Sequence, residues 1–141
     1  EELFSEIFAL TNNSKDIKEL RMLEHLPLSA RKKILKLSKS IMTKLTQDEV
    51  YAAKVALNAQ MMFEKEDFDS AETTYQSELY QITEKVIIQG QKEGSVVDGI
   101  PMKLVDYYWG VVYLYALKSL FTIKYELISE KDLARILLKD E

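Results

Sequence analysis

The chain has 141 residues, of which 47% are hydrophobic and 30% charged, a composition typical of one folded domain and not of a disordered segment. It has no cysteine and a net charge of -4, which excludes disulfides and thiolate metal sites and argues against a chain built as a whole to hold nucleic acid. No apolar run reaches the roughly 18 residues that a membrane span requires, and we expect a cytoplasmic protein.

Apolar residues recur at helical spacing along almost the whole chain, and this pattern predicts seven helices and no confident strand. The first helix covers Glu1–Thr11. Because the sequence opens inside this helix, we expect that an N-terminal part of the protein is missing from it. The second helix turns Ile17, Leu20 and Leu23 inward. We therefore expect an all-α fold, with residues 1–141 forming a single helical domain.

The third helix has a clear inward stripe, and Ser29 precedes it as a candidate N-cap. Thr46 and Glu49 have the T-x-x-E spacing of a capping box, which predicts that the next helix begins there. The inward stripe consists of Ala30, Ile34, Leu37, Ile41 and Leu45.

Two long helices occupy the second half of the chain. One covers residues from about 70 to 93, with Gly94 as its stop signal. The other covers Pro101–Lys124, with the proline in the first turn, where a helix tolerates it. Ser129 and Asp132 then open a short final helix.

The segment Pro101–Lys124 is apolar on nearly all sides, unlike a helix with a solvent-facing side. A domain of this size covers one side with its own core, so the other side needs a partner, and an identical chain is the simplest candidate. Together with the preceding helix, two copies would form a dimeric four-helix bundle of antiparallel helices. The expected interface residues are Ile82, Val86, Gln89, Trp109, Val112, Tyr113, Ala116 and Leu120.

The same pattern has a plainer explanation, in which both long helices are central in a monomer. Gly90 and Gly110 lie inside these helices, where glycine costs about 1 kcal/mol relative to alanine. This cost favours the close approach of another helix, but for either glycine alone simple tolerance explains it equally well.

Residues suited to catalysis or metal binding are sparse. His25 is the only histidine, so one chain cannot form a two-histidine metal site, and we expect this residue to cap a helix end or face solvent. The acidic residues from Glu64 to Asp69 lack the spacing of a calcium loop and predict a solvated loop. The basic run from Arg31 to Lys44 predicts a solvated helix face. We expect no enzymatic activity, no metal and no cofactor.

The best sign of a ligand site is a set of aromatic, methionine and leucine residues spread over several helices. Methionine adapts to irregular shapes, and tyrosine joins an apolar body to a polar group, so the mixture suits an apolar pocket with a few orienting groups. The same residues also suit a plain core, which is the commoner role for any one of them. The candidate effector-binding residues are Phe4, Phe8, Met42, Met61, Met62, Tyr75, Leu79, Tyr108 and Tyr115.

Four segments resemble the TetR family of transcriptional regulators. The opening Glu-Glu-Leu-Phe-Ser-Glu-Ile is similar to the start of the family's fourth helix. Residues 87–94, Ile-Ile-Gln-Gly-Gln-Lys-Glu-Gly, resemble the motif Ile-x-x-Gly-Gln-x-x-Gly at the end of its eighth helix. Gly99-Ile-Pro101 and Tyr108-Trp109-Gly110 are similar to signals of the ninth. The seven expected helices match helices four to ten, so the resemblance covers the whole chain.

This resemblance implies a function. Members of the family bind a small molecule in the helical core, dimerise through the eighth and ninth helices, and bind operator DNA through an N-terminal helix-turn-helix domain, which is absent from this sequence. The chain would then be the effector-binding and dimerising part of a bacterial transcriptional regulator, a repressor or an activator, with no membrane partner. Phe4 and Phe8 would couple a small, mostly apolar effector to the DNA-binding part. The alternative is a helical dimerising interaction module without a small-molecule site.

Overall fold

The computed structural model describes residues 15–57, 59–60, 78–122, 124 and 126–140. Regular structure in these ranges is helical, and the one β pairing within them is an isolated bridge between Val96 and Leu138. The all-α class expected from the sequence is therefore confirmed. The expected helix Glu1–Thr11 and the loop from Glu64 to Asp69 lie outside the described residues.

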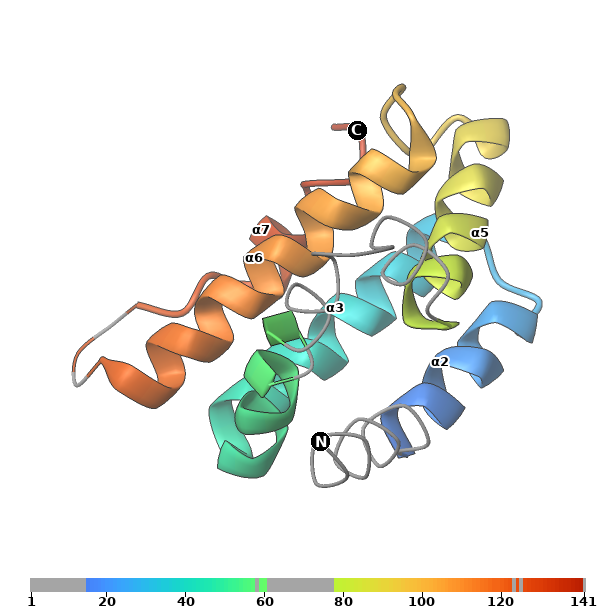
Figure 1. Ribbon diagram of the computed structural model, residues 1–141. Coiled ribbons are helices and arrows are strands. Elements are labelled where there is room, and N and C mark those ends of the chain that lie inside the picture. The colour runs from blue at the N-terminus through green and yellow to red at the C-terminus, as the bar shows by residue number, and fades with distance from the viewer. Residues whose placement is uncertain (1–14, 58, 61–77, 123, 125, 141) are drawn as a thin grey trace, which may run out of the picture.

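Helix α3 lies at the centre of the described fold, because it contacts each of the other four labelled helices. Figure 1 shows α2 and α7 on different sides of α3, with α6 running roughly parallel to α3 and above it in this view. A further helical segment covers residues 49–57. The labelled helices are α2 (Lys15–His25), α3 (Ala30–Gln47), α5 (Glu78–Glu93), α6 (Pro101–Phe121) and α7 (Glu130–Ala134).

The start of α3 agrees with the sequence pattern. The Ser29 hydroxyl accepts a hydrogen bond from the backbone amide of Lys32 at 3.2 Å, as an N-cap does. The stripe beginning at Ala30 and Ile34 is buried along the helix, with Leu37 only partly buried. The predicted cap and inward face of α3 are confirmed.

The capping box predicted at Thr46 and Glu49 is wrong. Thr46 still belongs to α3, and its hydroxyl donates to the carbonyl of Met42 at 2.7 Å. The next helix is capped by Asp48, whose carboxylate accepts from the amides of Val50 and Tyr51 at 2.9 and 3.2 Å. Aspartate caps a helix at least as well as threonine, so α3 continues past Thr46 and the chain turns at Asp48.

The corner between α5 and α6 depends on glycine. Gly94 has a φ of +82°, which a residue with a side chain rarely adopts, and it ends α5 as expected. At Gly90 a Cβ would overlap Val96 and lie 3.1 Å from the Cβ of Ala30, so the backbones approach closely there. Pro101 occupies the first turn of α6, as predicted, and α6 ends at Phe121 instead of Lys124.

The C-terminal segment closes this corner. Ser129 and Asp132 form the predicted reciprocal cap of α7, with bonds of 3.1 and 3.3 Å. Beyond α7, the amide of Val97 donates to the carbonyl of Leu137 at 2.8 Å, and the amide of Lys139 donates to Ser95 at 2.9 Å. Segments far apart in the sequence are thus held together beside α3.

Candidate interaction surface

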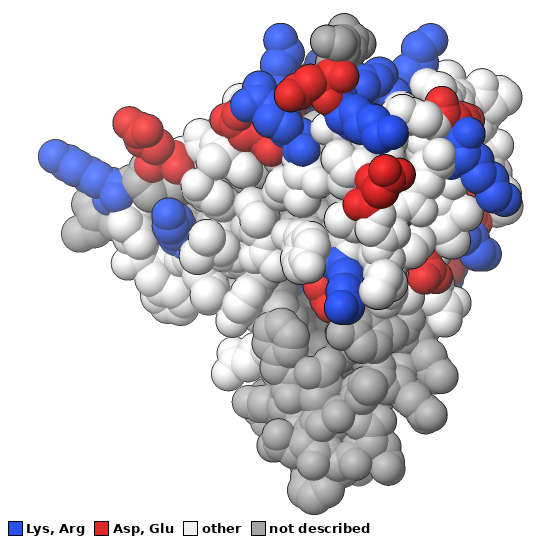
Figure 2. Space-filling model, turned by 90° about the horizontal axis from the view of Figure 1, so that it is seen from above, with Lys and Arg blue, Asp and Glu red and all other residues white. Residues whose placement is uncertain are grey.

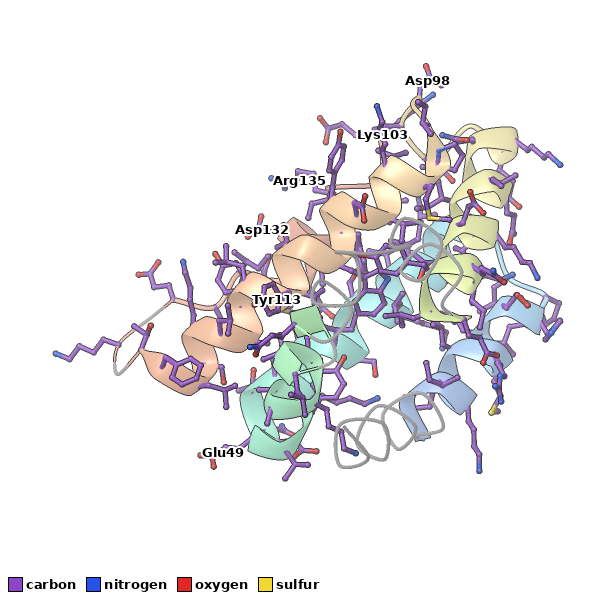
Figure 3. The ribbon with its side chains drawn as sticks, in the orientation of Figure 1. Glu49, Asp98, Lys103, Tyr113, Asp132 and Arg135 are labelled. Carbon is purple, nitrogen blue, oxygen red and sulfur yellow. The ribbon has the colours of Figure 1, made fainter. Side chains whose placement is uncertain are left out.

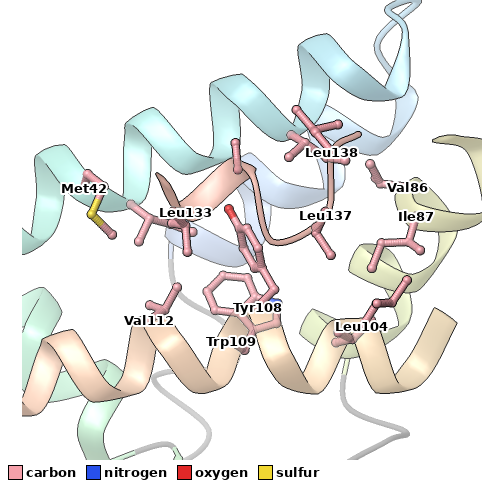
Figure 4. Packing of buried hydrophobic residues seen from close by; sticks show 14 of the residues in the cluster. Met42, Val86, Ile87, Leu104, Tyr108, Trp109, Val112, Leu133, Leu137 and Leu138 are labelled. Carbon is pink, nitrogen blue, oxygen red and sulfur yellow. The ribbon is translucent and has the colours of Figure 1, made fainter. Parts of the chain in front are cut away.

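One face of α6 packs into the core. Its buried residues include Val105, Trp109 and Ala116. Figure 4 shows Leu104, Tyr108 and Val112 of α6 facing a cluster to which α3, α5 and the C-terminal segment also contribute. The labelled neighbours in this cluster are Met42, Val86, Ile87, Leu133, Leu137 and Leu138.

The opposite face of α6 carries apolar side chains that remain exposed. Tyr107 is 56% exposed, Leu114 46% and Phe121 79%. Gly110 lies between them, and a Cβ built on it would meet no atom of the described residues within 4 Å. Leu117 is half-buried. We call these five residues the α6 seam.

The α6 seam has the spacing of a helix–helix contact. From Tyr107 to Phe121 its members follow one another at steps of three, four, three and four residues, the repeat that two packed helices share. Lys103 is exposed near the start of α6 and projects away from the other helices (Figure 3). The uncharged part of the face that carries the α6 seam therefore begins at Tyr107. Seen from above, charged side chains gather most densely along one edge, and a broad area in the middle of this view is uncharged (Figure 2).

Two hydrogen bonds in the core fix the rotation of α6 about its axis. Tyr108 and Ser38 of α3 are both fully buried, and a 2.8 Å bond joins their hydroxyl oxygens. Burial raises the pKa of Tyr108 well above its usual value, which the bond to Ser38 offsets only in part, so the phenol stays protonated. Trp109 donates through Nε1 to the hydroxyl of Thr83 at 3.0 Å, and Thr83 donates to the carbonyl of Leu79 at 2.7 Å. Anchored on α3 and α5, α6 presents its seam outward.

A buried lysine of α3 joins this helix to α2 and α5. Lys33 is only 4% exposed, and its Nζ donates to the carbonyl of Glu24 at 2.8 Å and to Oε1 of Gln89 at 2.9 Å. The expectation that the whole basic run faces solvent is wrong at this position. The ammonium group closes the carbonyl end of α2 and reaches α5, which a solvated lysine does not do.

Glu93 completes the junction from α5. Its carboxylate accepts from the amide of Ala30, at the start of α3, and from Nε2 of Gln89, both at 2.8 Å. The same Nε2 also donates to the carbonyl of Leu28 at 3.0 Å. The Gln89 and Ala30 hydrogen bonds, with the nearby charge of Lys33, lower the pKa of Glu93. The carboxylate is therefore held in its ionised form at the first turn of α3.

The residues expected at a dimer interface are mostly unavailable to a partner. Five of the eight are buried in the core of a single chain, so a partner cannot reach them in this arrangement. The predicted interface therefore lay on the core side of both helices. These five are Ile82, Val86, Trp109, Val112 and Ala116. The other three are half-buried: Tyr113, Leu120 and Gln89, whose side-chain amide serves the junction with α3.

The described effector candidates belong to one apolar cluster. Met42 and Tyr108 are buried in it, and Leu79 and Tyr115 pack against it while partly exposed. The ammonium of Lys118 lies 4.8 Å from the centre of the Tyr115 ring, a cation–π contact. The remaining candidates, Phe4, Phe8, Met61, Met62 and Tyr75, lie outside the described residues.

The described part of the chain shows no group of three or more His, Asp or Glu side chains able to hold a metal ion. His25 extends into solvent, with Nε2 3.5 Å from the carboxylate of Glu24. None of the described helices combines the length and apolar character needed to cross a membrane. Comparison with known protein families, with curated proteins and with solved structures finds no match for the chain.

Proposed function

We propose that this chain is the ligand-sensing and dimerisation domain of a TetR-like transcriptional regulator. In this proposal two copies associate through α6 and its surroundings, and a small, mostly apolar effector binds in the helical core. A helix-turn-helix domain on the N-terminal side would bind operator DNA in the cytoplasm. The chain itself would be neither an enzyme nor a cofactor protein.

The observation that carries the proposal is the exposed α6 seam. Tyr107, Leu114 and Phe121 would leave water on association, and burial of apolar area is the main driving force for such contacts. Stable dimers bury about 800 Å² on each partner, more than one line of side chains supplies. The half-buried residues beside the seam, Tyr113 and Leu120, would therefore join the contact.

The effector chemistry follows from the core beneath α6. Met42 and Tyr108 lie in an apolar cluster whose buried polar groups include the hydroxyls of Tyr108 and Ser38. A ligand that enters between α3 and α6 would be mostly apolar, with one hydrogen-bonding group able to replace the bond between these hydroxyls. It would shift the fold only to the extent that it binds one arrangement of the helices better than another.

A thermal-shift screen of the full chain against small apolar and aromatic compounds tests the sensing role. A true effector at about 100 times its dissociation constant stabilises the fold by about 2.7 kcal/mol and raises the Tm by several degrees. Met42→Ala is expected to reduce this shift, whereas Met22→Ala, at an exposed position on α2, leaves it unchanged. If no compound raises the Tm of a chain that does dimerise, the sensing role is contradicted.

One observation favours the alternative of a dimerising interaction module without a small-molecule site. Tyr108 has no exposed surface, and its hydroxyl is already bonded to Ser38, so the described core offers a complete set of contacts without a ligand. In such a module the α6 seam would keep its role in association, and the thermal-shift screen would yield no effector.

A further inference from the structure

The middle of α6 contains a glycine that no contact within the described chain requires. Gly110 is the tenth of the 21 residues of α6. A glycine inside a helix is destabilising relative to alanine, so its presence calls for a reason. Gly90, inside α5, has one, because a Cβ there would collide with Val96 and crowd Ala30. At Gly110, which is exposed, a Cβ would meet no atom of the described residues within 4 Å.

We propose that Gly110 is the point at which α6 crosses the α6 of a second copy of this chain. The two-fold axis of the dimer passes between the two Gly110 residues, where the missing side chains let the backbones approach closely. This inference rests on the proposed dimer and adds the position of its axis.

The residues around Gly110 have the form that such a crossing needs. Tyr107 lies three residues before the glycine and Leu114 four after it, so two large exposed side chains flank a gap on the same face. Packed helices insert a side chain of one into a hole of the other. A two-fold axis makes this contact reciprocal. Each copy has a gap over its own Gly110, and the side chains beside that gap also border the gap of its partner.

The occupant is a second copy because the seam complements itself. From Tyr107 to Phe121 the seam holds no charged residue, so an identical seam brings no like charges together. A two-fold axis also guarantees that each copy buries the same patch, whereas a foreign helix would have to match it independently. The three charged residues of α6 lie outside the seam: Lys103 and Asp106 come before Tyr107, and Lys118 follows Leu117.

Gly110 also lies beside the best-anchored part of α6. The two preceding residues, Tyr108 and Trp109, are bonded to Ser38 of α3 and to Thr83 of α5. Their rings contact each other edge to face, with centroids 5.5 Å apart. The crossing point is therefore held in place before association, which lowers the entropy lost on binding.

Disulfide trapping tests the position of the axis directly, because the chain has no cysteine of its own. Single cysteines are introduced by Tyr107→Cys, Gly110→Cys, Leu114→Cys and Phe121→Cys, with Leu35→Cys on the exposed face of α3 as a control. A disulfide needs Cα atoms within about 7 Å of each other. We expect Gly110→Cys to cross-link fastest and Leu35→Cys not to cross-link above the rate of random collision. Faster linking at another seam position in a dimeric protein overturns the crossing at Gly110 but leaves the proposed dimer standing.

A second pair of variants separates the crossing from the dimer itself. Gly110→Leu fills the gap and is expected to raise the dimer dissociation constant at least about tenfold, a change equivalent to about 1.4 kcal/mol. Circular dichroism should show unchanged helicity, because Gly110 is exposed in the monomer and a Cβ there meets no atom of the described residues within 4 Å. If Leu114→Lys disrupts the dimer but Gly110→Leu does not, the crossing lies elsewhere on the seam. If the unmodified chain is monomeric, both the crossing and the proposed dimer fail.

Discussion

Lys33 shows how one buried polar side chain joins three helices. It lies among exposed lysines in a run that the sequence marks only as basic, yet it bonds to the end of α2 and to α5. Its burial is not predictable from the run, because the helix turns each neighbour in a different direction and the partners are 9 and 56 residues away. The core positions of α3, by contrast, follow from their spacing.

Lys33→Met is expected to lower the free energy of unfolding by about 1–3 kcal/mol, since the partly buried Glu24 carbonyl and Gln89 amide oxygen lose a charged donor. Lys32→Met is the matched control at an exposed neighbour, with an expected change below about 0.5 kcal/mol. Urea unfolding monitored by circular dichroism measures both. Equal effects at the two positions would refute the junction assigned to Lys33.

Tyr108→Phe is expected to cost about 1–2 kcal/mol of unfolding free energy, because the hydroxyl of Ser38 is left buried without its partner. Ser38→Ala should cost a similar amount, and the double variant less than the sum of the two. Additive losses in this double-mutant cycle would show that the two hydroxyls do not depend on each other.

The contribution of Tyr108 also has a predictable dependence on pH. Burial raises its pKa in the folded chain, whereas a tyrosine of the unfolded chain ionises near pH 10. Above this pH the unfolded state binds fewer protons than the folded state. The contribution of Tyr108 to the free energy of unfolding is therefore full below about pH 10 and falls as the pH rises further. The stability difference between the natural chain and Tyr108→Phe should therefore shrink in alkali, as measured by unfolding curves from about pH 8 to 11.

At the scale of whole elements, local sequence signals fixed most helix ends but not the rotation of α6. Ser29 and Gly94 act where their chemistry predicts, because a cap needs only its neighbours in sequence. The face of α6 that enters the core depends on distant partners such as Thr83 and Ser38. An apolar pattern on all sides does not determine that choice, so the predicted interface fell largely on the buried side.

Replacing the two helical glycines by alanine should change the free energy of unfolding in opposite directions. In the background of Leu114→Lys, which we expect to be monomeric, Gly110→Ala should raise the free energy of unfolding by about 1 kcal/mol, because alanine favours the helix and its methyl group meets no atom of the described part of the chain. Gly90→Ala should lower it by about 1–3 kcal/mol, since the methyl group collides with Val96. Thermal or urea unfolding of the two variants compares the signs, and a loss of stability at Gly110 would contradict the open space assigned to it.

At the scale of the whole molecule, the described helices pack around α3 in a large and a small apolar cluster, and they leave an apolar line exposed on α6. The sequence predicted that α6 needs burial partners on two sides, and the described helices cover one of them. The fold class and the core positions of α3 were predictable because they follow from spacing along the chain. The residues of the exposed line, with Tyr107 and Phe121 at its ends, became identifiable only once the core side of α6 was known.

Sedimentation equilibrium of the chain over a wide range of concentration tests the central claim, that the α6 seam holds two copies together. The natural chain should sediment as a species of twice 16.4 kDa. Leu114→Lys should shift this species to 16.4 kDa, and Leu35→Lys, a leucine of similar exposure on α3, should leave it dimeric. A natural chain that stays at 16.4 kDa at the highest concentration would contradict association through the α6 seam.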